Sequence, residues 1–89
     1  LSLSWTQIED ETACALASVL ASNRCTSLSQ VFLPHNSITT AGAVAIAAAL
    51  STNSSLRELD LRFNKIRVDG ARAFAESLSS NSSLTLLDL

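Results

Sequence analysis

Apolar positions along this chain follow two periods that alternate. Near the end of residues 56–61, apolar side chains recur at every second position, as in a half-buried β-strand. In residues 70–78 they recur instead at i, i+3, i+4 and i+7, which is one face of a helix. These helical positions are Ala71, Phe74, Ala75 and Leu78. The pattern therefore predicts a unit of strand, turn, helix and loop.

The unit recurs at a fixed step of 28 residues. Equivalent positions are Leu28, Leu56 and Leu84; Val31, Leu59 and Leu87; Leu33, Leu61 and Leu89; Asn36 and Asn64; Gly42 and Gly70; and Asn53 and Asn81. A first unit fits at a step of 30, and its two extra residues fall in a loop, where insertions are tolerated. A single unit cannot bury both of its faces alone, but stacked neighbours can. Residues 1–89 are therefore expected to form one stack of segments 1–27, 28–55, 56–83 and 84–89.

Composition excludes several classes of protein. The chain has 89 residues, a net charge of -2 and six Lys and Arg residues, without a basic cluster that would neutralise phosphates. A nucleic-acid partner is therefore not expected. The longest apolar run, 41–50, has ten residues, whereas about 20 are needed to span a bilayer, so no membrane insertion is expected. The excess of Leu, Ala and Ser belongs to the repeat itself.

The two cysteines, Cys14 and Cys25, form no CxxC pair and have no nearby His for a metal site. We expect free thiols in a reducing, cytoplasmic compartment, with a disulfide as the alternative. Asn53 and Asn81 each begin an Asn-Ser-Ser sequon. Their shared position in the repeat favours a structural role over glycosylation, which stays open.

The strand motif Leu-x-x-Leu-x-Leu-x-x-Asn-x-Ile of residues 56–66, and its equivalent in 28–38, resembles the leucine-rich repeat. The 28-residue period with an Ala-rich helix resembles the ribonuclease-inhibitor-like subclass, which includes the repeats of NOD-like receptors and of the Ran GTPase-activating protein. The resemblance implies an α/β solenoid, a right-handed β-α superhelix with a curved parallel sheet inside and helices outside. It also implies that Asn36 and Asn64 form an amide ladder that satisfies backbone groups where the chain leaves each strand.

Other repeated positions have a physical role of their own. Gly42 and Gly70 are expected to admit close backbone approach at the start of a helix. We expect Asn23, Asn53 and Asn81 to end helices in the left-handed conformation, which Asn tolerates.

Strand alternation places a set of conspicuous side chains on the concave face and its rim. Trp5, His35 and Phe63 share one column, while Phe32, Asp60 and Arg62 occupy neighbouring columns. Exposed aromatic residues are frequent hot spots of protein interfaces, so we expect these six residues to contact a protein partner. Packing against turns within the solenoid is the alternative.

On the convex side, the first two helices are expected to present an unusually uncharged surface to solvent. Its residues are Cys14, Val19, Val44, Ala48 and Ala49. We expect this face to pack on another subunit or domain.

No constellation of residues indicates catalysis. His35 has no acid and nucleophile beside it in the sequence, and Asp60 and Asp88 alone supply too few oxygens for a metal ion. No cofactor is expected. We therefore expect a non-enzymatic protein–protein interaction scaffold or a structural subunit of a larger complex. The alternatives are the sensor or autoinhibitory repeats of a NOD-like receptor and a Ran-type GTPase activator, in which Arg62 and Arg24 would be candidates.

The terminal units of a repeat array normally carry polar caps, which both end strands of this sequence lack. We therefore expect residues 1–89 to be a segment of a longer array, and to be marginally stable or to aggregate when produced alone.

Overall fold

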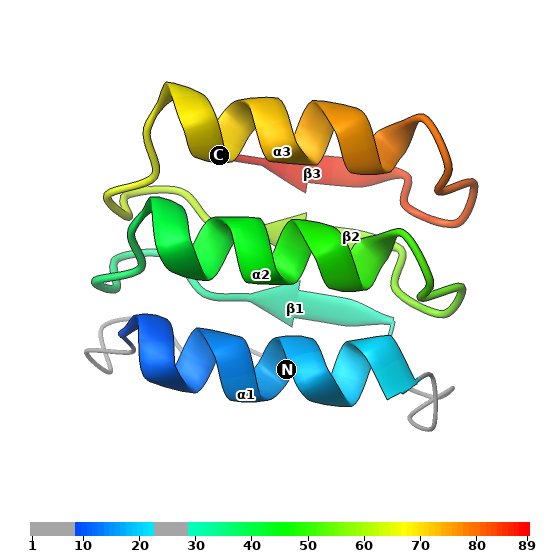
Figure 1. Cartoon of the computed structure of the whole chain (residues 1–89), viewed down its shortest axis with the longest axis horizontal. Coiled ribbons are helices and arrows are strands. Elements are labelled where there is room, and N and C mark those ends of the chain that lie inside the picture. The colour runs from blue at the N-terminus through cyan, green and yellow to red at the C-terminus, as the bar shows by residue number, and fades with distance from the viewer. Residues whose placement is uncertain (1–8, 23–28) are drawn as a thin grey trace.

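The computed structural model describes residues 9–22 and 29–89. Its elements are α1 (Asp10–Ser22), β1 (Gln30–Phe32), α2 (Thr40–Leu50), β2 (Glu58–Asp60), α3 (Val68–Leu78) and β3 (Leu86–Asp88). Figure 1 shows the three helices side by side in one layer, with the strands in a second layer behind them. The expectations for Trp5, Asn23 and Cys25 fall outside the described residues.

The strands form a parallel sheet in the order β1-β2-β3. Val31 pairs with Leu59, and Leu59 pairs with Leu87, so the partners across the sheet are 28 residues apart in the chain. The repeat in the sequence is therefore the hydrogen-bonding register of the sheet. The predicted α/β class is confirmed, although each strand has three residues and is shorter than the apolar pattern of 56–61 indicated.

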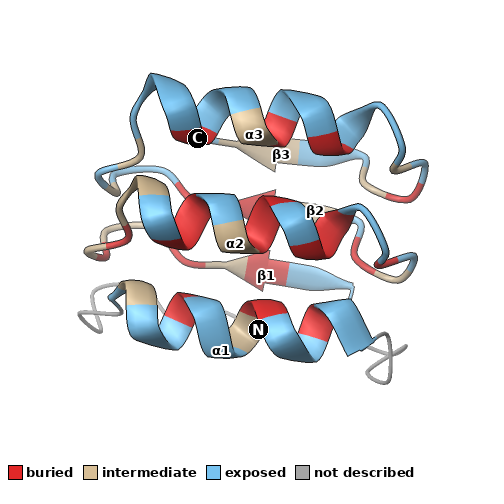
Figure 2. Ribbon diagram, viewed as in Figure 1, coloured by how far each residue is buried: buried red, intermediate tan, exposed pale blue. Residues whose placement is uncertain are grey.

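The core lies between the helix layer and the sheet. Val31, Leu59, Ile46 and Phe74 are almost fully buried there, and small alanines of α1 and α2 let the helices approach each other and the strands. Figure 2 shows that α2, in the middle of the helix layer, carries more buried residues than α1 or α3. The middle unit thus has a neighbour on both sides.

Both glycines lie where a helix starts close to the neighbouring unit, as expected. A Cβ atom on Gly42 would be 2.5 Å from the Asp10 carboxylate and 2.9 Å from Ile38, and one on Gly70 would be 2.6 Å from Ile66. These distances are shorter than van der Waals contact, so only glycine fits without displacing a neighbour.

The carboxylate of Asp10, at the start of α1, caps the N-terminus of the next helix. Its Oδ1 accepts hydrogen bonds from the backbone N–H of Thr39 at 2.7 Å and of Gly42 at 3.1 Å, and its Oδ2 accepts one from the Thr39 hydroxyl. Thr39 is the N-cap of α2 and makes no side-chain cap of its own. A side chain from one unit thus satisfies orphan N–H groups of another, next to the positive end of the helix dipole.

Asn53 and Asn81 form a ladder along the edge where helices end. The side-chain amide of Asn53 donates to the Leu20 carbonyl at 3.1 Å, and that of Asn81 donates to the Leu50 carbonyl at 2.7 Å. Each Oδ1 accepts from two backbone N–H groups of its own loop. Orphan carbonyls at the end of one helix are therefore satisfied by the following unit.

The expected left-handed conformation of Asn53 and Asn81 is wrong. Within the described residues, His35 and Phe63 are the non-glycine residues with positive φ. The helices α2 and α3 end instead through Ser51 and Ser79 in the right-handed conformation. The two asparagines are retained for their amides, which reach the neighbouring unit, and not for a backbone angle.

The C-terminal end of the stack exposes apolar side chains whose equivalents one unit earlier are buried. Leu50 is 0% exposed, whereas its equivalent Leu78 is 40% exposed, and Leu61 is 1% exposed, whereas its equivalent Leu89 is 49% exposed. The difference arises because α3 and β3 have a neighbour on one side only within this chain.

Leu50→Ala should therefore lower the free energy of unfolding far more than Leu78→Ala does. We expect about 2–5 kcal/mol for Leu50→Ala, which opens a cavity in the core, and less than about 1 kcal/mol for Leu78→Ala. Urea unfolding monitored by circular dichroism measures both. Equal losses would mean that something covers α3, such as another copy of the chain.

The cap by Asp10 should make stability depend on pH. Hydrogen bonds lower the pKa of Asp10 below its ordinary value of 3.8, and the one from the Thr39 hydroxyl has the largest effect. A carboxyl whose pKa is lower in the folded state contributes stability that is present above pH 3.8 and is lost as the pH falls through the folded pKa. Asp10→Asn should flatten this decline in urea unfolding below about pH 4, and Glu11→Gln is the control. An unchanged decline in Asp10→Asn would contradict the cap.

Candidate interaction surface

The strand-to-helix loops 33–39 and 61–67 lie side by side at one edge of the molecule, on the left in Figure 1. Backbone hydrogen bonds join them: His35 N–H donates to the Arg62 carbonyl at 3.0 Å, and Lys65 N–H donates to the Ile38 carbonyl at 2.8 Å. The parallel register of the sheet thus continues into the loops and places equivalent residues next to each other.

Asn64 connects the two loops through its side chain. Its Oδ1 accepts from the Ile38 N–H at 3.1 Å, and its Nδ2 donates to the carbonyls of Leu33 at 2.8 Å and of Leu61 at 3.1 Å. Asn36, at the equivalent position one unit earlier, is buried and donates to the Pro34 carbonyl at 3.2 Å. These amides satisfy backbone groups that leave the strands and hold the loops in place.

The residue before each of these asparagines has left-handed backbone geometry. His35 has φ 57° and Phe63 has φ 59°, a conformation that is uncommon for side chains of this size. Their rings stack, with centroids 4.3 Å apart and planes 9° from parallel. Phe63 is 66% exposed. The loops therefore present the Phe63 ring to solvent, stacked on the half-buried His35 ring, and Phe32 in β1 is half-buried as well.

Sequence reasoning placed His35 and Phe63 in one column but missed their backbone conformation. Neither position carries the Gly or Asn that normally signals a left-handed residue. The signal that could have revealed it is the Asn that follows each of them, because its amide bonds close a tight turn.

Asp60 and Arg62 form an ion pair at the end of β2. The Arg62 guanidinium donates to both Asp60 oxygens through Nε and Nη2, at distances between 2.9 and 3.2 Å, and the Arg62 N–H also donates to Asp60 Oδ1. These contacts, the Arg62 side chain first, hold the pKa of Asp60 below its ordinary value. Asp60 was expected to be exposed, and this is wrong: it is 7% exposed, whereas the side chain of Arg62 is exposed.

On the helix side, the expected exposure of Val19, Val44 and Ala48 is confirmed. Ala49 is an exception, because it is buried. Its equivalent Ser77 is buried too, and its hydroxyl donates to the Ala47 carbonyl of the neighbouring helix. The side chain at this position packs between two helices. The docking of another subunit on this face stays a prediction.

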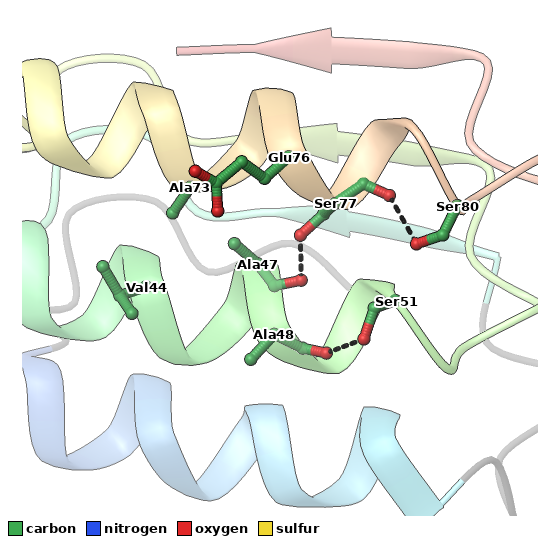
Figure 3. Close-up of a pocket in the computed structure, with 8 residues that line it drawn as sticks. All are labelled: Val44, Ala47, Ala48, Ser51, Ala73, Glu76, Ser77 and Ser80. Carbon is green, nitrogen blue, oxygen red and sulfur yellow. Dashed lines mark hydrogen bonds between the residues drawn. The ribbon is translucent and has the colours of Figure 1, made fainter.

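Two shallow grooves run between the helices, of about 270 Å³ between α2 and α3 and about 420 Å³ between α1 and α2. Figure 3 shows that the serine hydroxyls of the first groove point at backbone carbonyl oxygens. Ser51 donates to the Ala48 carbonyl, and Ser80 donates to the Ser77 carbonyl. These hydroxyls are thus already hydrogen-bonded. The alanines beside them offer an apolar packing surface with no reactive or hydrogen-bonding side-chain group.

The described residues contain no group of three His, Cys, Asp or Glu side chains that could hold a metal ion. In that same part of the chain, none of the helices has the length and apolar character required to cross a membrane.

Comparison with known proteins supports a leucine-rich repeat. A family model described as Leucine Rich repeat matches residues 52–75, which include β2, Asn64 and most of α3. A search of curated proteins found no significant match. A solved structure titled "Leiomodin-1 Actin-Binding Site 2 (ABS2)" is similar over 98% of this chain, with a TM-score of 0.90 and 25% sequence identity. This chain covers 50% of that one, so it spans half of its length.

Replacing Arg62 should raise the pKa of Asp60. Arg62→Met keeps an unbranched apolar stem but removes the hydrogen bonds and charge that lower the pKa of this carboxyl. A carboxyl-carbon NMR titration of Asp60 measures the shift. Arg72→Met, which removes an exposed cation on α3, serves as the control and should leave the titration of Asp60 unchanged.

Proposed function

We propose that this chain is a non-enzymatic protein–protein interaction module that recognises its partner through the edge formed by loops 33–39 and 61–67 and the adjoining sheet face. The observation that carries the proposal is the stacked His35–Phe63 pair, whose Phe63 ring is 66% exposed on loops fixed by Asn64. An aromatic ring held in one conformation loses little entropy when a partner covers it, which is the property of an interface hot spot.

The rest of the surface supports recognition over catalysis. Nε and Nη2 of Arg62 donate to Asp60, so this guanidinium would have to leave its ion pair to reach a partner's nucleotide site. This makes Arg62 a weaker candidate for the Ran-type activator, and Arg24, the other candidate, lies outside the described residues. The exposed Arg62 and the half-buried Phe32 extend the aromatic pair, while the buried Asp60 holds Arg62 in place.

Actin is the first partner to test. The similar solved structure is titled as an actin-binding site. The similarity covers 98% of this chain and 50% of that one. We further propose that the units belong to the ribonuclease-inhibitor-like subclass and form part of a longer solenoid. The 28-residue register and the exposed Leu78 and Leu89 support this, since a further unit would bury both side chains.

The proposal is tested with Phe63→Asn. Asn tolerates the left-handed conformation, so this change removes the ring and keeps the turn. We expect affinity for labelled monomeric actin, measured by fluorescence anisotropy, to fall about tenfold or more. Val44→Ser removes an exposed apolar side chain from the helix side and is the matched control, with an expected change below about twofold.

Loss of binding in Val44→Ser but not in Phe63→Asn would place the partner on the helix side and contradict the proposal. If the unsubstituted chain does not bind actin, the actin assignment fails. The surface itself is then tested by cross-linking in a native extract, where Phe63→Asn must remove the cross-linked species that Val44→Ser retains.

A further inference from the structure

The charges of this chain are distributed unevenly along the strand-to-helix edge. Five of the six Lys and Arg residues lie in the third unit, and three of them lie in the single loop 61–67. These three are Arg62, Lys65 and Arg67. The total charge of -2 conceals this local group of cations, which is smaller than the basic cluster that a phosphate backbone would require.

The equivalent positions of the other units carry no such charge. The loop 33–39 contains neither acidic residues nor Lys and Arg, and the start of α1 carries Glu9, Asp10 and Glu11. Since the units stack in chain order, this edge changes from acidic at the start of α1, through the uncharged loop 33–39, to a net positive segment 61–69, in which Asp69 in the first turn of α3 offsets one of the three cations. A ligand that follows charge has one favoured position on this edge and one direction along it.

The basic loop is open to solvent and keeps most of its charge. Arg62, Lys65 and Arg67 are all exposed. Asp60 neutralises Arg62, whereas the ion pairs among the described residues leave Lys65 and Arg67 without an acidic partner. The exposed ring of Phe63 and the side chain of Val68, which is 71% exposed, lie in the same segment. Cations around an apolar anchor form a surface that suits an acidic segment with an apolar residue.

We propose that loop 61–67 docks an acidic segment of the partner protein, with partner carboxylates on Lys65 and Arg67 and an apolar partner side chain on Phe63. The proposal rests on the proposed function, because Phe63 belongs to both, and it names the chemistry of the partner. Glu9, Asp10 and Glu11 at the other end of the edge repel such a segment and so set its direction.

Other ligands fit loop 61–67 less well. Two unpaired cations on one short loop are too few to follow a phosphate backbone, and the chain as a whole is acidic. The acidic start of α1 in a second copy offers carboxylates, but α1 presents beside them no exposed large apolar side chain in its first two turns to cover Phe63.

The test uses the full chain and a fluorescein-labelled peptide of about twelve residues, in which glutamates flank a central Leu–Leu pair. The matched peptide carries lysine in place of glutamate. The loop variant is Lys65→Glu with Arg67→Glu, and its control is Arg57→Glu with Arg72→Glu, which changes the net charge by the same amount outside the loop. Circular dichroism verifies that both variants fold.

We expect the glutamate peptide to bind and the lysine peptide not to bind. The loop variant should weaken binding of the glutamate peptide about tenfold, the control variant less than about twofold, and added salt should weaken binding to the unsubstituted chain. Equal effects of the two variants, equal binding of the two peptides, or equally tight binding of a thymidine oligonucleotide would overturn the proposal. Sedimentation that shows self-association lost in the loop variant, without peptide binding, would assign the loop to a second copy.

The outcomes separate this inference from the proposed function. If the two peptides bind alike while Phe63→Asn still abolishes binding of the partner, the acidic segment is wrong and the aromatic surface stands. If the loop variant loses the glutamate peptide while Phe63→Asn leaves partner binding intact, the charged dock stands and the aromatic surface is wrong.

Discussion

Hydrogen bonds that pass from one unit to the next are the interactions on which this structure depends. Asn64 bridges two strand-to-helix loops, Asn53 and Asn81 bridge helix ends, and Asp10 bridges two helix starts. Strands of three residues supply few backbone hydrogen bonds, so these side chains satisfy groups that the sheet leaves over. Each unit thus relies on its neighbours for part of its hydrogen bonding. It relies on them in the same way to bury its apolar side chains.

The candidate surface is a product of this ladder. Asn64 fixes the turn that precedes it, and the turn places Phe63 in a backbone conformation that its side chain alone does not favour. The parallel register then brings the His35 ring beside it. An exposed ring gains a defined position from backbone hydrogen bonds beneath it, while the residues that face solvent remain free to differ between units.

Repetition made the fold readable from the sequence. The step of 28 gave the register of Val31, Leu59 and Leu87, because a parallel sheet of equal units repeats at the period of the chain. The sequence did not predict the side chains that occur in one unit alone, or the hydrogen bonds that join different units. Asp10 has no equivalent carboxylate in later units. The hydrogen bond from the Asn53 side chain to the Leu20 carbonyl joins residues 33 apart in the chain. Asp60 looked exposed because alternation assigns a face but does not show that Arg62 covers it.

Asp10 has one more consequence, which concerns the order of the units. Its carboxylate meets Thr39 and Gly42 of the second unit, whereas the residue at the equivalent position of the second unit is Thr40, which has no charge. The units resemble one another in sequence, but the first supplies a carboxylate to the helix start of the unit that follows it. A chain with the first and second units exchanged would lose this carboxylate from the start of α2. The order of the units therefore depends on side chains such as Asp10, and not only on the period of the repeat.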